Sequence, residues 1–304
     1  MTPPDTYLQP DAPDPVLGDE YVRELIARHA EVSPGEVSVD ETGGEARTYI
    51  CGDVVLKTQR PHRLRPRTSL EKEVFILEEI DRQITLPIPR VLGYGRDGDV
   101  EYEILSRIPG IALRDATPNV AARSAVLKDL GRVLRQFHEL DQARFRVSPL
   151  VPGDAGASDT ILRLTEQFDE LSASVEDLST AVPNLDQLRE KVLSSVPQNI
   201  DTVVLHSNPG AEHCFVDPAT ETFTGLIDFG DSYRSHPALD VRSWRSVEDS
   251  REILAGYASS GSLSSDFMDV WRAGMIMSEL RLLARGYRDA HEVSVSIAEL
   301  TSIT

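Results

Sequence analysis

The sequence predicts an α+β protein in which a strand-rich first part precedes a mainly helical second part. Short apolar runs separated by glycines occupy roughly the first hundred residues, whereas apolar residues spaced three and four apart dominate the rest. The chain of 304 residues is long enough for one large domain or two lobes. With 40% hydrophobic and 27% charged residues, it has the composition of an ordinary globular protein.

The chain is strongly acidic, with a formal net charge of -19 and an isoelectric point near 4.8. This charge argues against a nucleic-acid partner held by bulk electrostatics. It would suit a cationic small-molecule partner, although an acidic surface that is merely solvated is the commoner explanation.

The opening of the chain carries no basic-then-apolar signal segment, and no apolar run approaches the roughly 18 residues that cross a bilayer. We therefore expect a cytoplasmic protein with no membrane partner. Residues 1–16, rich in proline and aspartate, are expected to form a flexible arm. Cys51 and Cys214 lie in apolar runs and are expected to be small buried residues.

The first part is predicted to contain two helices and several short strands. The expected elements are a helix at Tyr21–Ala30, strands at Val37–Glu41, Ala46–Cys51, Asp53–Thr58 and Tyr102–Ser106, and a second helix beginning at Thr68. Thr68 and Glu71 fit a capping box at the start of that second helix. Gly43 and Gly44 lie between the first two strands, where a plain hairpin turn is the commonest explanation.

Lys57 follows the apolar residues of a predicted strand, where a lysine is uncommon without a partner. In the following helix, Glu73 shares a face with apolar residues by three- and four-residue steps. Glu71 has a local role in the capping box and lies off that face. Glu73 is therefore the better partner for Lys57, with Glu71 second, and a surface helix charge is the alternative explanation for Glu73.

The second part contains long stretches with helical spacing. Helices are predicted at Ala121–Leu140, Asp159–Ser174, Leu185–Ser195, Val247–Tyr257 and Asp266–Tyr287. We place the strand-rich lobe at residues 17–108 and the helical lobe at residues 109–304.

Residues 203–231 carry the densest set of polar motifs. A short apolar strand runs into His206-Ser207-Asn208, and a polar loop then leads to His213. A second apolar run ends in Asp228-Phe229-Gly230-Asp231. Short buried strands that end in polar residues commonly place those side chains at the mouth of a cleft.

The order and spacing of these motifs resemble those of the aminoglycoside phosphotransferase-like kinases, which are relatives of choline kinase and, more distantly, of the protein kinases. The segment at His236–Asp240 is similar to a further element of that family. The resemblance covers roughly residues 20–290 and implies a two-lobed protein-kinase-like fold, with a small antiparallel-sheet lobe and a larger, mainly helical lobe.

The family resemblance also implies a function: transfer of the γ-phosphate of ATP or GTP, with Mg²⁺, to a hydroxyl of a small molecule. An antibiotic such as an aminoglycoside is the first expectation, and antibiotic resistance the role that follows. The resemblance implies that Lys57 holds nucleotide phosphates and that Glu73 orients Lys57. Gly43 and Gly44 would cover the phosphates, and Ser106 and Ile108 would meet the adenine edge.

Two positions depart from the family pattern. Asn208 occupies the position of the catalytic aspartate, and an amide oxygen has no useful basicity. Activity is therefore expected to be reduced or abolished, either by nature or by deliberate replacement to trap a complex. His213 stands where most relatives carry a metal-binding asparagine.

The remaining site residues are assigned by the same resemblance. His206 supports the loop, Asp228 is the best metal ligand with His213 as the second, and Asp240 ties the catalytic loop in place. Acidic residues that would suit a cationic acceptor are Asp231, Glu248 and Asp249, although a solvated acidic face is the commoner explanation for each. The alternative function is a nucleotide-binding pseudokinase that acts as a binding or regulatory module.

Overall fold

The computed structural model describes residues 14–30, 36–41, 45–63, 69–174, 178, 182, 184–242 and 246–302. Packing divides the chain into two compact units that interleave along the sequence. The first unit comprises Met1–Thr117, Leu140–Pro152 and Glu212–Tyr233, and the second comprises Pro118–Glu139, Gly153–Ala211 and Arg234–Thr304. The lobe boundary expected at residue 108 is not tested by this grouping and stays a prediction.

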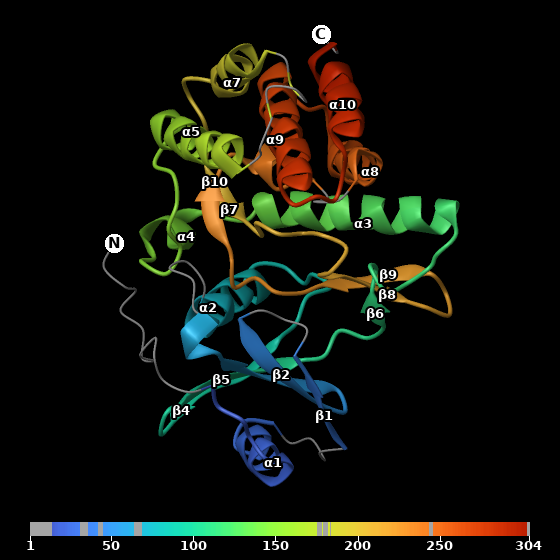
Figure 1. Ribbon diagram of the computed structural model, residues 1–304. Coiled ribbons are helices and arrows are strands. Elements are labelled where there is room, and N and C mark those ends of the chain that lie inside the picture. Colours follow the sequence, from blue (N-terminus) through green and yellow to red (C-terminus); the bar gives the residue numbers. More distant parts are fainter. Residues whose placement is uncertain are drawn as a thin grey trace. The chain divides into compact units, whose positions relative to one another are not determined.

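The first unit contains a five-stranded antiparallel sheet with strand order β1-β2-β3-β5-β4. Its strands are β1 (Val37–Asp40), β2 (Ala46–Cys51), β3 (Val54–Gln59), β4 (Val91–Asp97) and β5 (Val100–Ser106). Two helices, α1 (Asp19–Ala27) and α2 (Leu70–Asp81), lie on opposite faces of this sheet (Figure 1). The predicted strands agree with the observed ones to within one or two residues at each end.

The two faces of the sheet have different chemistry because successive strand residues point to opposite sides. Leu56 of β3 and Ile104 of β5 join the apolar cluster that includes residues of α1. Lys57 and Glu103, the adjacent residues of the same strands, are register partners. They therefore lie on the other face, the one covered by α2.

The N-cap of α2 is Ser69, whose side chain accepts a hydrogen bond from the N–H of Lys72 at 3.1 Å. This corrects the predicted capping box, because the first helical residue is Leu70 and Glu71 is one place too early to close the box with Ser69. Thr68, the predicted cap, lies outside the described residues.

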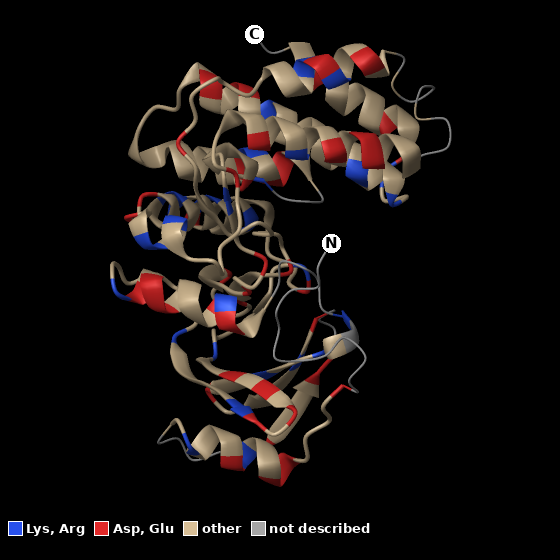
Figure 2. Ribbon diagram, turned by 90° about the vertical axis from the view of Figure 1, so that its left-hand side faces the viewer, with Lys and Arg blue, Asp and Glu red and all other residues tan. Residues whose placement is uncertain are grey.

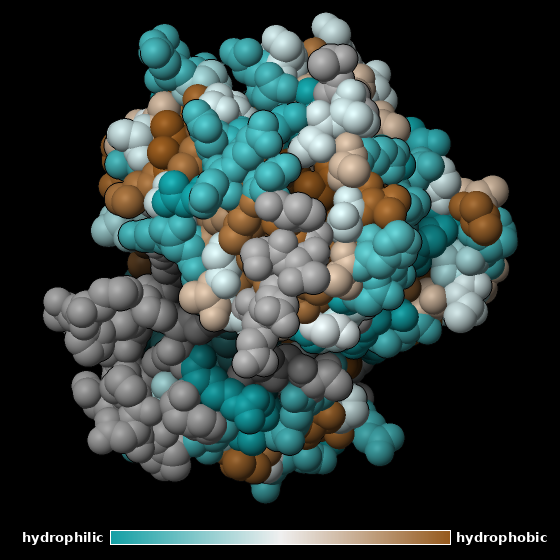
Figure 3. Space-filling view, turned by 45° about the horizontal axis from the view of Figure 1, so that its top comes forward, coloured by the Kyte–Doolittle hydropathy of each residue, from teal (hydrophilic) through white to brown (hydrophobic). Residues whose placement is uncertain are grey.

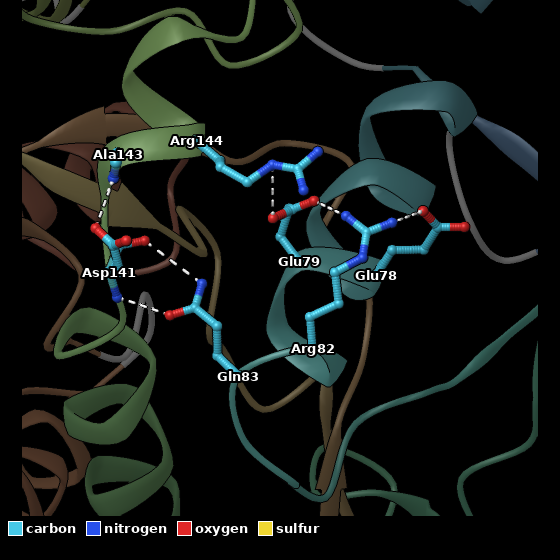
Figure 4. A network of polar contacts seen from close by, with 7 residues as sticks. All are labelled: Glu78, Glu79, Arg82, Gln83, Asp141, Ala143 and Arg144. Carbon is cyan, nitrogen blue, oxygen red and sulfur yellow. Dashed lines mark hydrogen bonds and ion pairs between the residues drawn. The ribbon is translucent and has the colours of Figure 1, made fainter.

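A polar network joins the C-terminal end of α2 to the segment around the short helix α4, which spans Ala143–Val147 (Figure 4). The buried carboxylate of Glu79 contacts the guanidinium groups of Arg82 and Arg144, with Arg144 Nε 3.2 Å from Glu79 Oε2. Gln83 Oε1 accepts a hydrogen bond from the N–H of Asp141 at 2.8 Å. These contacts fix the position of α2 within the first unit.

A second, three-stranded sheet completes the first unit. Its order is β6-β8-β9, with β6 at Ile111–Ala112, β8 at Cys214–Asp217 and β9 at Thr222–Leu226. Both neighbouring pairs are antiparallel. Strand β9 leads directly to Asp228, so this small sheet sets where that carboxylate emerges.

The second unit is mainly helical. Its helices are α3 (Val120–His138), α5 (Ala157–Ser174), α7 (Leu185–Ser194), α8 (Val247–Tyr257), α9 (Ser265–Ala284) and α10 (Ala290–Ser302). Strand β7 (Val203–Leu205) pairs with β10 (Tyr233–Ser235). The expected α+β arrangement, an antiparallel sheet followed by a mainly helical part, is confirmed. Helix α10 was not predicted, although its buried residues Val293, Ile297 and Leu300 have helical spacing.

Charged residues of both signs occur along the helices and strands of each unit (Figure 2). On the face shown in Figure 3, hydrophilic residues separate the apolar ones into small patches, which is usual for protein surfaces. Within the described ranges, no helix is both long enough and apolar enough to span a bilayer.

Helices α3 and α8 approach so closely that two glycines are required at their crossing. A β-carbon added at Gly131 would overlap the carbonyl of Ile253, and one added at Gly256 would overlap the carbonyl of Lys128. In both cases the added β-carbon would meet a backbone atom, and backbone, unlike a side chain, cannot move aside by changing rotamer.

We expect Gly256→Ala to lower the free energy of unfolding by about 1–3 kcal/mol, because the added methyl group must push two helix backbones apart. Denaturant titration measures this change. Gly261→Ala is the matched control, since a β-carbon there meets nothing within 4 Å. Equal stability of the two variants would contradict the close crossing.

Candidate functional site

Lys57 lies among three acidic side chains in the first unit. Its Nζ is 2.8 Å from Glu73 Oε2, 3.6 Å from Glu103 Oε1 and 3.6 Å from Asp228 Oδ1. The Lys57–Glu73 pair expected from the sequence is therefore present. Glu71 instead lies 3.6 Å from Arg96 through its Oε2.

The surroundings of Lys57 hold it as an ammonium ion. Burial alone would lower the pKa of Lys57, but the acidic side chains around it, Glu73 and Asp228 first and Glu103 after them, outweigh that effect and raise it above its usual value. A lysine whose side chain is only 12% exposed, that keeps its charge and has one partly exposed partner, is suited to bind an anion.

Helix α2 also holds the segment that follows β9. Glu73 Oε1 accepts a hydrogen bond from the N–H of Phe229 at 3.3 Å. The ammonium group of Lys72 donates to the carbonyl of Ser232 at 2.9 Å. Glu73 thus uses one oxygen for Lys57 and the other for the backbone next to Asp228, and so couples the positions of those two residues.

The pairing of β8 and β9 places His213 beside Asp228. The N–H of Ile227 donates to the carbonyl of His213 at 3.0 Å, which extends the strand pairing by one step. His213 Nε2 then lies 3.1 Å from Asp228 Oδ2. Asp228 adopts the left-handed backbone region, with φ 73°, and 45% of its side chain is exposed.

The Asp228 carboxylate is a ligand of the kind that hard metal ions prefer. Magnesium prefers oxygen ligands and is commonly held by one or two carboxylates together with substrate phosphates. Asp228 is a partly exposed carboxylate of that kind. His213 offers a nitrogen and contacts the carboxylate itself. Among the described residues, no three His, Cys, Asp or Glu side chains form a complete metal cluster.

Glu103 is a member of this cluster that sequence reasoning missed. Its side chain is fully buried on β5, directly across from Lys57. Burial first, and then the neighbouring Glu73 carboxylate, raise the pKa of Glu103 well above its usual range. The signal available in the sequence was a glutamate inside the β-prone run at Tyr102–Ser106. Only the β3–β5 register connects it with Lys57.

The loop after β7 lies in the second unit and is held by Asp240. The Oδ2 and Oδ1 atoms of Asp240 accept hydrogen bonds from the N–H groups of His206 and Ser207, at 2.6 and 2.7 Å. His206 Nδ1 accepts one from the N–H of Asn208 at 3.2 Å. The residues predicted to support this loop thus contact it directly. Ser207 takes φ 80°, a conformation that these bonds stabilise.

Asp240 is enclosed by further polar side chains. His138 Nε2 lies 3.1 Å from Asp240 Oδ2, and His138 Nδ1 lies 3.0 Å from the Tyr257 hydroxyl. Burial pushes the pKa of Asp240 upward, but the bonds from His138 and His206 outweigh burial, so its pKa is lower than usual. Asp240 is therefore a carboxylate in the folded protein.

Some backbone groups near the predicted adenine contact already form hydrogen bonds within the protein. The N–H of Ser106 donates to the carbonyl of Arg90, and the N–H of Arg107 donates to the carbonyl of Asp53, both at 2.8 Å. Ile108 follows them and is buried. The predicted phosphate-covering residues Gly43 and Gly44 lie outside the described residues.

The acidic residues expected at an acceptor pocket differ in their surroundings. Asp249 is buried, and its carboxylate is paired with Arg123 of α3, with Arg123 Nε donating at 2.9 Å. Glu248 is exposed in the first turn of α8. Asp231 is half-buried and belongs to the first unit. Asp249 is the least available of the three, because any cationic ligand must compete with Arg123.

Comparisons with known proteins identify a family. Residues 36–287 match the model of the phosphotransferase enzyme family. An aminoglycoside 3'-phosphotransferase from Streptomyces fradiae is 26% identical over 164 residues, which are 53% of this chain and 58% of that enzyme. The chain thus matches little more than half the length of this curated relative.

Solved structures share the fold at low identity. The GDP and kanamycin complex of APH(2")-IIia has a TM-score of 0.66 at 17% identity, covering 93% of this chain and 98% of that one. The streptomycin-ATP-APH(2")-IIa ternary complex has a TM-score of 0.59 at 17% identity, covering 95% and 98%. A macrolide 2'-phosphotransferase from Brachybacterium faecium has a TM-score of 0.60 at 18% identity, covering 94% and 99%.

We expect Asp240→Asn to destabilise the second unit by about 1–3 kcal/mol at neutral pH, because an amide cannot accept both backbone bonds without burying an unpaired N–H. Because folding lowers the pKa of Asp240, the wild-type stability from this group is present at neutral pH and is lost as pH falls through the folded-state pKa. The difference between wild type and variant should therefore shrink in acid. Thermal unfolding across pH measures it.

Asp186→Asn, at an exposed position of α7, is the control for this substitution. A stability difference for Asp240→Asn that does not change with pH would contradict the lowered pKa of Asp240.

Proposed function

Because the chain belongs to the phosphotransferase enzyme family, we propose that it binds ATP or GTP and transfers the γ-phosphate to a hydroxyl group of a small molecule. The observation that carries this proposal is the arrangement of Lys57 between Glu73 and Asp228 in the first unit. It combines a charged ammonium for phosphate with a partly exposed carboxylate for a metal ion, which are groups that phosphoryl transfer requires.

Each residue then has a stated task. Lys57 binds nucleotide phosphate oxygens, and Glu73 keeps the ammonium in place through the 2.8 Å contact. The N–H groups of Ser106 and Arg107 already donate within the sheet, so Ile108 is the proposed donor to the base. Asn208 orients the acceptor hydroxyl, and His206 and Asp240 hold the Asn208 loop in the second unit.

Asp228 is the proposed ligand for Mg²⁺, which when bound would neutralise charge on the nucleotide phosphates. In this proposal His213 orients the Asp228 carboxylate from 3.1 Å, in place of the predicted role as a second ligand. Magnesium's preference for oxygen over nitrogen ligands supports this choice.

An aminoglycoside is the proposed acceptor. A relative is an aminoglycoside 3'-phosphotransferase, and two structural neighbours are complexes with kanamycin and with streptomycin. The net charge of -19 would favour the approach of a polycationic acceptor. A macrolide phosphotransferase shares the fold at similar TM-score, so macrolides belong in the same acceptor panel. Antibiotic resistance would follow from phosphorylation of either class.

Asn208 limits the rate of the proposed phosphoryl transfer. An asparagine oxygen can accept a hydrogen bond from the acceptor hydroxyl but cannot take its proton. Because phosphoryl transfer depends mainly on positioning and charge stabilisation, a slow reaction remains available without a base. The specific observation that favours the alternative, a nucleotide-binding pseudokinase, is this same residue.

We expect Asn208→Asp to raise kcat about 100- to 10,000-fold, because it restores a general base, while nucleotide affinity changes little. ATP consumption with a panel of aminoglycosides and macrolides measures the rate, and calorimetry measures nucleotide binding. If both forms bind nucleotide and neither turns over with any acceptor, the pseudokinase function replaces the proposed one.

We expect Asp228→Asn to remove most of the magnesium dependence of nucleotide binding, with at least the roughly 10- to 100-fold loss in metal affinity that outer-shell changes cause. Calorimetry with ATP, in magnesium and in chelator, measures this. Asp99→Asn, at an exposed position in the β4–β5 turn, serves as the control. Unchanged magnesium dependence in Asp228→Asn would exclude Asp228 as the metal ligand.

A further inference from the structure

Glu103 has an unusual environment for a glutamate. It lies in the middle of β5 with no exposed side-chain surface. Among the described residues, neither carboxyl oxygen of Glu103 has a hydrogen-bond partner that meets normal geometry, and the nearest cation is Lys57 Nζ at 3.6 Å. Burying a carboxyl in this way is costly. An apolar residue would fill the same strand position without that cost.

The charges around Lys57 explain why the protonated form of Glu103 suits this position. If Glu73, Glu103 and Asp228 were all ionised, one ammonium would face three carboxylates in a mostly buried space. A proton on Glu103 relieves this repulsion, in agreement with the raised pKa of its carboxyl. The protonated group would offer its O–H to Glu73 and its carbonyl oxygen to Lys57.

Lys57 also has a competing partner. Asp228 Oδ1 lies at the same 3.6 Å from Lys57 Nζ as Glu103 Oε1 does. An ammonium drawn fully onto Asp228 would occupy a carboxylate oxygen that a metal ion needs. Glu73 and Glu103 lie on α2 and β5, whereas Asp228 follows β9. Tyr94 of β4, the other register partner of Glu103, donates its hydroxyl to Glu101.

We propose that Glu103 is a positioning residue that, together with Glu73, holds the Lys57 ammonium off Asp228 and so keeps that carboxylate open to a metal-bound nucleotide. This inference rests on the proposed function, because it assigns phosphate to Lys57 and metal to Asp228. It adds a third group to the lysine–glutamate pair, and it gives the buried glutamate of β5 a task.

The test compares Glu103→Met, which removes both polar atoms at similar length, with Glu103→Gln, which keeps a donor and a carbonyl. Nucleotide affinity is measured by calorimetry with a non-hydrolysable ATP analogue over a series of magnesium concentrations. We expect Glu103→Met to need about tenfold more magnesium for half-maximal binding, with affinity in chelator nearly unchanged. Glu103→Gln should behave like the wild type.

Crystal structures of the nucleotide-free variants supply the second readout. In Glu103→Met, Lys57 Nζ should lie closer to Asp228 than the present 3.6 Å, and in Glu103→Gln it should stay in place. Glu101→Gln is the matched control, because Glu101 is a buried carboxylate of the same strand that bonds Tyr94 instead of Lys57. Glu103→Leu replaces Glu103→Met if the latter does not fold.

Three outcomes would overturn the inference: equal loss of binding with and without magnesium, failure of glutamine to restore the wild-type magnesium requirement, or an unchanged Lys57 position in Glu103→Met. If the wild type binds no nucleotide under any condition, the proposed function fails. The crystal structures then still decide whether Glu103 keeps Lys57 off Asp228.

Discussion

The ion pair between Lys57 and Glu73 is the interaction on which the first unit's site depends. It joins the sheet to α2 through a 2.8 Å contact, and the second oxygen of Glu73 accepts from the backbone beside Asp228. One glutamate therefore sets the relation among a strand, a helix and the turn after β9. A buried pair of this kind adds little to stability on its own, but losing either partner would leave an uncompensated charge.

In the second unit, a different set of groups holds the loop after β7 in place. Asp240 satisfies two backbone N–H groups of a loop that contains a left-handed residue, and His138 and Tyr257 hold Asp240 in turn. Buried polar chains such as this one specify a single arrangement, because any shift leaves a polar atom unpaired. Loop geometry in this unit is thus determined from α3 and α8, far from the loop in sequence.

Sequence reasoning succeeded where the signal was local or was carried by family motifs. Strand and helix positions followed from apolar spacing, and the choice of Glu73 over Glu71 followed from a helical face. It failed for Glu103, because the contact with Lys57 depends on the β3–β5 register, which no local pattern encodes. It also misplaced the cap of α2 by one residue, since Thr68 and Ser69 are both good capping residues and only the backbone selects between them.

The interleaving of the two units has a consequence for biosynthesis. Lys57 and Glu73 emerge from the ribosome long before Asp228, because the first unit draws on three separate stretches that end at Tyr233. Until the last stretch is translated, the face of the sheet around Lys57 has Glu73 and Glu103 but lacks Asp228. Contacts of such long sequence separation are slow to form. The first unit therefore cannot complete this face until the chain through Tyr233 has been synthesised.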